Sequence, residues 1–121
     1  MSEHLRMLGR AVLTTSYVSI YAVPPLTGPE KAQGTPPQAA VSSIILCETA
    51  NSSATVSIQF SPNGIDTSSS PASYEIFDTL ALTGNETKII APGIMMGSGD
   101  RIRAKAASGT VNIFIFGSEI L

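Results

Sequence analysis

Ala54–Phe60, which reads ATVSIQF, alternates apolar and polar side chains from end to end. This period of two is the pattern of a β-strand, because successive side chains of a strand point to opposite faces of a sheet. We expect the apolar members to face a core and the polar members to face solvent. The apolar set is Val56, Ile58 and Phe60, and the polar set is Thr55, Ser57 and Gln59. The stretch therefore predicts a half-buried strand with one wet face.

Runs of the same kind recur along the chain, and no helical stripe interrupts them. Arg101–Ala106 alternates as regularly, with Ile102, Ala104 and Ala106 predicted to point inward and Arg101, Arg103 and Lys105 predicted to form an outward ridge of cations. Further strands are predicted at Met7–Thr14, Tyr17–Val23, Val41–Cys47, Tyr74–Leu80, Thr87–Ala91 and Thr110–Ile120. Seven to eight short strands separated by Gly, Asn, Ser and Pro predict an all-β fold, an antiparallel β-sandwich of jelly-roll-like form.

The final predicted strand, Thr110–Ile120, is apolar on both of its faces. Val111, Ile113 and Ile115 share one face, whereas Phe114 and Phe116 share the other. A strand of this kind lies between two layers of its own domain, or another subunit covers its second face. Ile113 and Ile115 are predicted to join the core.

The 121 residues fit a single β-sandwich domain spanning residues 1–121, within which two segments fit poorly. Met1–Arg10 precedes the first strong strand and is expected to be a short arm that would fray unless Leu5, Met7 and Leu8 packed against a neighbour. Pro24–Gln38 is a Pro-rich loop whose restricted backbone would lose little entropy on docking. Both segments are predicted to be contact elements, with plain disorder as the alternative.

Charged residues make up 13% of the chain, against about 25% in ordinary soluble domains. A surface so poor in charge favours coverage by partner proteins. The net charge of −2 gives no attraction to nucleic acid or anionic lipid, so neither is expected as a partner. No apolar run approaches the roughly 18 residues of a membrane span, and residues 1–10 lack the apolar run of a signal peptide. We expect a protein made in the cytosol.

The residue types that carry catalysis or bind metal are scarce. His4 is the one histidine and Cys47 the one cysteine, so a Cys/His zinc site cannot form within one chain. The carboxylates are scattered over turns and strand ends, and Gly97–Asp100 precedes a predicted strand rather than the helix of a phosphate-binding loop. These features predict a protein that is not an enzyme and holds no cofactor or metal.

The ridge of Arg101, Arg103 and Lys105 is the one ordered charge feature of the sequence. No aromatic residue alternates with these cations, which argues against nucleic acid bound by base stacking. The ridge is predicted to be a solvated face, or alternatively a rim contact to an acidic patch on a neighbouring subunit.

Several short stretches occur in an order that resembles one protein family. They are Leu8-Gly9, Tyr21–Pro24, Val41–Cys47, Tyr74–Asp78, Asn85–Thr87, Gly93-Ile94, Gly99–Ile102 and Phe116–Ile120. In this order they resemble a family of small virion proteins of tailed bacteriophages. The resemblance implies a compact β-sandwich that decorates the head or is associated with the tail, and it implies no catalytic residue. The chain departs from the family at Pro24–Gln38, where the family usually has a short turn.

The expected function is thus that of a non-enzymatic virion structural protein, made in the host cytoplasm. Its expected partners are copies of itself, in a homotrimer by analogy, and other capsid or tail proteins. The candidate interface residues are Leu5, Met7, Leu8, Arg101, Arg103, Lys105, Phe114 and Phe116. The alternative is a receptor- or carbohydrate-binding domain of a tail fibre. That alternative needs clustered aromatic residues, yet the chain has no Trp and its three tyrosines are spread out.

Overall fold

The computed structural model describes residues 3–24, 37–62, 75–108 and 110–120, of which residues 3–5 and 120 are described by their backbone alone. The described residues form nine strands and no helix. The strands are β1 (Glu3–Val12), β2 (Val18–Ala22), β3 (Gln38–Glu48), β4 (Ala54–Ser61), β5 (Glu75–Leu82), β6 (Thr87–Ile90), β7 (Ile94–Met96), β8 (Arg101–Ala106) and β9 (Val111–Ile120). Among these residues, therefore, no helix could cross a membrane.

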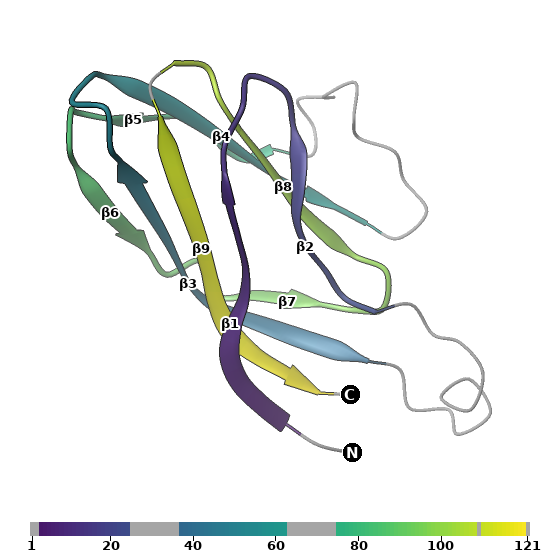
Figure 1. Ribbon diagram of the computed structural model, residues 1–121. Helices are drawn as coiled ribbons and strands as arrows, with labels where there is room; N and C mark the ends of the chain where they lie inside the picture. The colour runs from purple at the N-terminus through teal and green to yellow at the C-terminus, as the bar shows by residue number, and fades with distance from the viewer. Residues whose placement is uncertain (1–2, 25–36, 63–74, 109, 121) are drawn as a thin grey trace.

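The strands pair into two antiparallel sheets that stack as layers (Figure 1). We call β1-β9-β3-β6, with β7 also paired to β3, sheet A, and β2-β8-β4-β5 sheet B. Apart from β7, this is the pairing of eight strands in two four-stranded sheets that makes a jelly roll. The prediction of an antiparallel β-sandwich is confirmed.

The one strand that the sequence did not predict is β7. It follows Pro92 and Gly93, and Gly93 has a φ of 65°, so the backbone bends away from the run that forms β6. Three residues are also too few to display an alternating pattern. β7 pairs with Ala39–Val41 of β3, whereas β6 pairs with Ile44–Cys47, so the two short strands share one edge of sheet A.

The core lies between the two sheets and includes most of the residues predicted to face inward. Ile113 and Ile115 of β9 are fully buried against sheet B, whose inward residues Val56, Ile58 and Ile102 are also 0% exposed. Phe60, predicted to be buried as well, is only partly buried against the edge of this cluster. Alternation in the sequence therefore identified the inner faces of β4 and β8 in sheet B and of β9 in sheet A.

The outward face of β4 differs from its prediction as a wet face. Ser57 is 5% exposed, and Gln59 and Ser61 are 0% exposed. Ser57 stands beside Lys105 of β8, and Gln59 stands between Arg103 of β8 and Glu75 of β5, so longer side chains flank the shorter ones. The sequence pattern shows which residues share a face, but the neighbouring strands decide how far that face is covered.

The amino-terminal segment is also corrected, because residues 3–12 form β1 rather than an arm. β1 pairs with β9 from Glu3 opposite Ile120 to Val12 opposite Asn112, which brings the two ends of the chain together (Figure 1). A Cβ atom added at Gly9 would lie 2.3 Å from the carbonyl oxygen of Ile20, so β1 also packs directly on β2. Removing residues 1–10 would therefore remove an edge strand of the sandwich. Most of the predicted Pro-rich loop, residues 25–36, lies outside the described residues.

Candidate interaction surface

The outer face of sheet A carries a continuous set of apolar side chains. In the strand register, Phe114 of β9 stands between Arg10 of β1 and Ile45 of β3, and Ile45 stands opposite Ile89 of β6. Cross-strand partners share a face of the sheet, so this row crosses four strands. We call the outward hydrophobic residues of sheet A the apolar face: Met7, Val12, Ile45, Ile89, Met95, Phe114 and Phe116.

Several side chains of the apolar face are open to solvent. Among the described residues, five large hydrophobic side chains are exposed: Met7 43%, Val12 59%, Ile76 40%, Ile89 68% and Met95 73%. Four of the five belong to the apolar face, and no described strand lies over it. Exposed hydrophobic side chains that share one face of a sheet make that face a candidate interaction surface.

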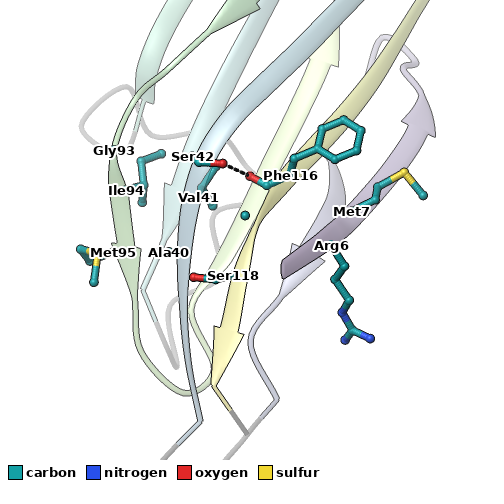
Figure 2. Close-up of a pocket in the computed structure, with 11 residues that line it drawn as sticks. Arg6, Met7, Ala40, Val41, Ser42, Gly93, Ile94, Met95, Phe116 and Ser118 are labelled. Atoms are coloured by element: carbon teal, nitrogen blue, oxygen red, sulfur yellow. Dashed lines mark hydrogen bonds between the residues drawn. The ribbon is translucent and has the colours of Figure 1, made fainter. Parts of the chain in front are cut away.

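A groove with a volume of about 610 Å³ runs along this face between β1 and β7. Figure 2 shows Met7 and Phe116 on one side of it and Ile94 and Met95 on the other. Its floor lies at a bulge of β3, where the Ser42 hydroxyl donates a hydrogen bond of 3.2 Å to the Phe116 carbonyl oxygen. The hollow thus lies where the pairing of β3 with β9 is irregular.

A second hollow of about 430 Å³ lies farther along β1 and β9. Arg10, Ala11, Val12, Asn112 and Phe114 line it. Its walls combine the exposed Val12 side chain and the Phe114 ring with the guanidinium of Arg10, which is exposed. This hollow offers an apolar contact and a positive charge side by side.

A buried carboxylate stands behind the groove. Glu119 of β9 is 2% exposed and accepts hydrogen bonds from the Tyr21 hydroxyl and from Nη2 of Arg6. Desolvation of the ring, together with the hydrogen bond to the nearby Glu119 charge, raises the pKa of Tyr21 far above its ordinary value. The cluster joins β1, β2 and β9. Both carboxylate oxygens of Glu119 are therefore engaged by side chains of the same chain.

The cation ridge lies on the opposite face of the molecule, on β8 in sheet B, so it does not border the apolar face. Lys105 Nζ lies 4.8 Å from the centroid of the Tyr17 ring, and the Tyr17 hydroxyl donates a hydrogen bond to Glu75. Desolvation and this contact with Glu75 raise the pKa of Tyr17. The Nε atom of Arg103 and both amide atoms of Gln59 are buried without a hydrogen-bond partner. The ridge is therefore partly covered, not a freely solvated face.

The structure thus separates the eight candidate interface residues. Met7, Phe114 and Phe116 lie together on the apolar face, so these three could belong to one interface. Leu8 instead packs against the core, because the bulge between Met7 and Gly9 shifts the register of β1. The Leu5 side chain lies outside the described residues, although its backbone is in register with Ser118. Arg101, Arg103 and Lys105 belong to sheet B.

Sequence reasoning missed four members of the apolar face: Val12, Ile45, Ile89 and Met95. Val12, Ile45 and Ile89 were ordinary apolar residues of predicted strands, whereas Met95 lay outside every predicted strand. Only the pairing of strands distant in sequence places them beside Phe114 and Phe116. The one signal in the sequence was alternation: Ile45 follows Ile44 and Phe114 follows Ile113, so each had to face away from the core if its neighbour was buried.

The residues considered for catalysis do not gather into a site within the described part of the chain. Cys47 lies on the outer side of sheet A, where its Sγ accepts a hydrogen bond of 3.5 Å from the Thr87 hydroxyl. Among the described residues no three His, Cys, Asp or Glu side chains converge as metal ligands would. The His4 side chain lies outside the described residues.

No protein-family model matches the chain, and no curated protein sequence matches it. Among solved structures, the chain is similar to the Drosophila NLP-core, whose crystal structure is described as providing insight into pentamer formation and histone binding. The two share 14% identity with a TM-score of 0.49, and the match covers 100% of each chain. A likeness at this level says nothing about what the present chain binds.

Proposed function

We propose that the chain is a non-enzymatic structural protein that assembles with copies of itself through the apolar face, as a component of a tailed-bacteriophage particle. The observation that carries the proposal is the exposure of Val12, Ile89 and Met95 beside Phe114 and Phe116. Covering apolar surface stabilises an assembly by roughly 25 cal/mol per Å². The mechanism is therefore burial rather than chemistry.

The shape of the apolar face favours a protein partner over a small molecule. Small-molecule sites are concave and enclose most of their ligand. Here the row from Phe114 through Ile45 to Ile89 extends across the sheet, and both hollows open onto it. A broad apolar centre with a cation at its rim, supplied by Arg10, is the usual composition of a protein interface. Interfaces between identical chains are the more apolar class, which favours a second copy as the partner.

The place of this assembly in a virion is supported by the order of short stretches that resembles small tailed-phage virion proteins. A head-decoration or tail-associated position follows from that resemblance, as do other virion proteins as partners. The low content of charged residues, 13%, agrees with a surface that neighbours cover. Trimeric assembly is an expectation by analogy with virion β-sandwiches.

Replacing Phe114 by Asp tests the role of the apolar face. We expect Phe114→Asp to fold like the wild-type chain, because Phe114 points away from the core. Its self-association should weaken by about 30-fold or more, the effect of losing an interface hot spot. Sedimentation velocity across micromolar concentrations measures this change, with Ser19→Asp on the exposed side of sheet B as the matched control. An undiminished oligomer of Phe114→Asp would contradict the proposal.

The virion assignment has a separate test. Antibodies raised against the purified chain are expected to label intact particles, purified from the strain that encodes it, at a repeated position on the head or tail. Mass spectrometry of the same particles should find the chain in multiple copies per particle. If the chain is abundant in the lysate but absent from purified particles, the virion assignment fails while the self-association remains to be judged by Phe114→Asp.

A further inference from the structure

The fifth exposed hydrophobic side chain, Ile76, lies away from the apolar face. It belongs to β5, which is an edge strand of sheet B. Asp78, two residues later, is exposed as well, and Phe77 between them packs against the core. Residues two apart on a strand share a side. The β5 edge therefore presents one apolar and one acidic side chain together.

The opposite edge presents the complementary combination. β1 is an edge strand of sheet A, and its outward residues include Arg10 and Val12. Both line the 430 Å³ hollow, together with Phe114. Val12 is 59% exposed, and within the part of the chain that the structure describes neither Arg10 nor Asp78 forms an ion pair.

The two pairs also have the same spacing in the sequence. Arg10 and Val12 are two residues apart in a regularly paired part of β1, and Ile76 and Asp78 are two residues apart on β5. Ile76 and Asp78 flank Phe77, where the pairing of β5 with β4 shifts register, and both are exposed there. If the strands run antiparallel beside one another, Asp78 meets Arg10 while Ile76 meets Val12 and the Phe114 ring.

This contact cannot form within one chain. β1 begins the order of sheet A and contacts β2, whereas β5 ends the order of sheet B and leads through a short turn to β6 at the far end of sheet A. Figure 1 shows β5 and β6 on one side of the sandwich and β1 and β2 on the other. Two different surfaces at opposite edges make a heterologous contact, which closes into a ring of identical chains when the rotation permits.

We infer that the chain assembles head to tail, with the β5 edge of one copy, Ile76 and Asp78, seated on Arg10, Val12 and Phe114 of the next. This inference rests on the proposed self-association and specifies which surface covers the β1 edge of the apolar face, at Val12 and Phe114. The partner is a second copy, recognised by an apolar contact flanked by an ion pair.

Mixing two defective variants tests the heterologous geometry. Val12→Asp keeps its β5 edge intact, and Ile76→Asp keeps its β1 edge intact. Each variant alone is expected to be monomeric and to keep a cooperative thermal transition, because both positions are exposed. An equimolar mixture is expected to form 1:1 dimers and nothing larger, since only one intact contact can form. Sedimentation velocity and native mass spectrometry resolve these species.

A charge exchange tests the predicted pairing of Arg10 with Asp78. Arg10→Asp and Asp78→Arg are each expected to raise the dissociation constant about 10-fold or more through like-charge contact. The double variant should recover most of that loss. Because the two residues lie at opposite edges of one chain, coupling between them can arise only across a contact between copies.

The outcomes separate this inference from the proposed function. If wild-type chain stays monomeric at all accessible concentrations, the proposed self-association fails and the head-to-tail arrangement fails with it. If the wild-type chain and Ile76→Asp form the same oligomer, while Phe114→Asp does not, the apolar face still assembles but the β5 edge is not its partner. Absence of a 1:1 dimer in the mixture, or of charge rescue, would equally overturn the head-to-tail contact.

Discussion

Replacing Ile113 by Asp is expected to leave the chain unfolded. Ile113 is 0% exposed in the middle of β9, between Ala11 of β1 and Leu46 of β3, with sheet B packed over it. A carboxylate there would have no counter-charge and no water, and burying it costs at least several kcal/mol. That loss is comparable with the total stability of a small domain, about 5–15 kcal/mol.

The measurement compares Ile113→Asp with Phe114→Asp, which introduces the same side chain one residue later in the same strand. Phe114 points to the outer face, so its variant is expected to retain the β-sheet circular dichroism spectrum and a cooperative urea transition. Ile113→Asp should be insoluble, or soluble without such a transition. A soluble, cooperatively unfolding Ile113→Asp chain would show that the assignment of the inner face of β9 is wrong.

Replacing Glu48 by Gln is expected to lower the melting temperature by on the order of 10 °C, although the two side chains have nearly the same shape. Glu48 ends β3 and its side chain is 1% exposed. Its Oε2 accepts hydrogen bonds from the backbone N–H groups of Ala50 at 3.0 Å and Thr110 at 3.1 Å. Its Oε1 accepts from those of Ser52 and Asn85, both at 3.1 Å.

One carboxylate therefore holds three connections of the chain together, those between β3 and β4, β5 and β6, and β8 and β9. In Glu48→Gln a single oxygen remains as an acceptor. The new amide NH₂ would face two backbone N–H donors that have lost their partner, and buried donors without an acceptor are strongly destabilising. The loss arises from hydrogen-bond polarity and not from packing.

The same contacts give Glu48 a role in acid stability. Desolvation of this carboxylate opposes its ionisation, but the four backbone N–H donors outweigh it and lower the pKa of Glu48 from its ordinary 4.5 to about 2. In the unfolded chain the group takes up a proton near pH 4.5, whereas in the folded chain it stays ionised until about pH 2. Its contribution is thus fully present above about pH 4.5 and is lost as the pH falls toward 2.

Glu86→Gln is the matched control for this experiment. Glu86 lies in the turn between β5 and β6, and its Oε1 accepts from the backbone N–H of Thr83 at 2.8 Å and from the Thr83 hydroxyl at 3.2 Å. A glutamine oxygen can keep both bonds, so this variant should melt within a few degrees of the wild-type chain. Thermal unfolding from pH 7 to pH 2 makes the comparison. Equal melting temperatures for the two variants, or an unchanged acid slope in Glu48→Gln, would refute the role given to Glu48.

The importance of Glu48 could not be read from its surroundings in the sequence. It follows the apolar run of β3, where a carboxylate looks like an ordinary polar residue at a strand end. The donors reach Glu48 by different routes. The local turn brings Ser52 close, whereas the pairing of β3 with β6 and with β9 brings Asn85 and Thr110 close. Glu119 was hidden in the same way, since Tyr21 and Arg6 approach it from β2 and β1.

The sequence by itself determined the all-β class, eight of the nine strands and the inner faces of β4, β8 and β9, because alternation along a strand is a local property of the backbone. Tertiary structure decided everything that depends on which strands are neighbours. It placed residues 3–12 as a paired edge strand, buried Ser57 and Gln59 beside longer side chains, and separated the cation ridge from Phe114 and Phe116. Pairing in a jelly roll joins segments that are far apart in the sequence. A local pattern therefore cannot show that the apolar face belongs to one sheet and the β5 edge to the other.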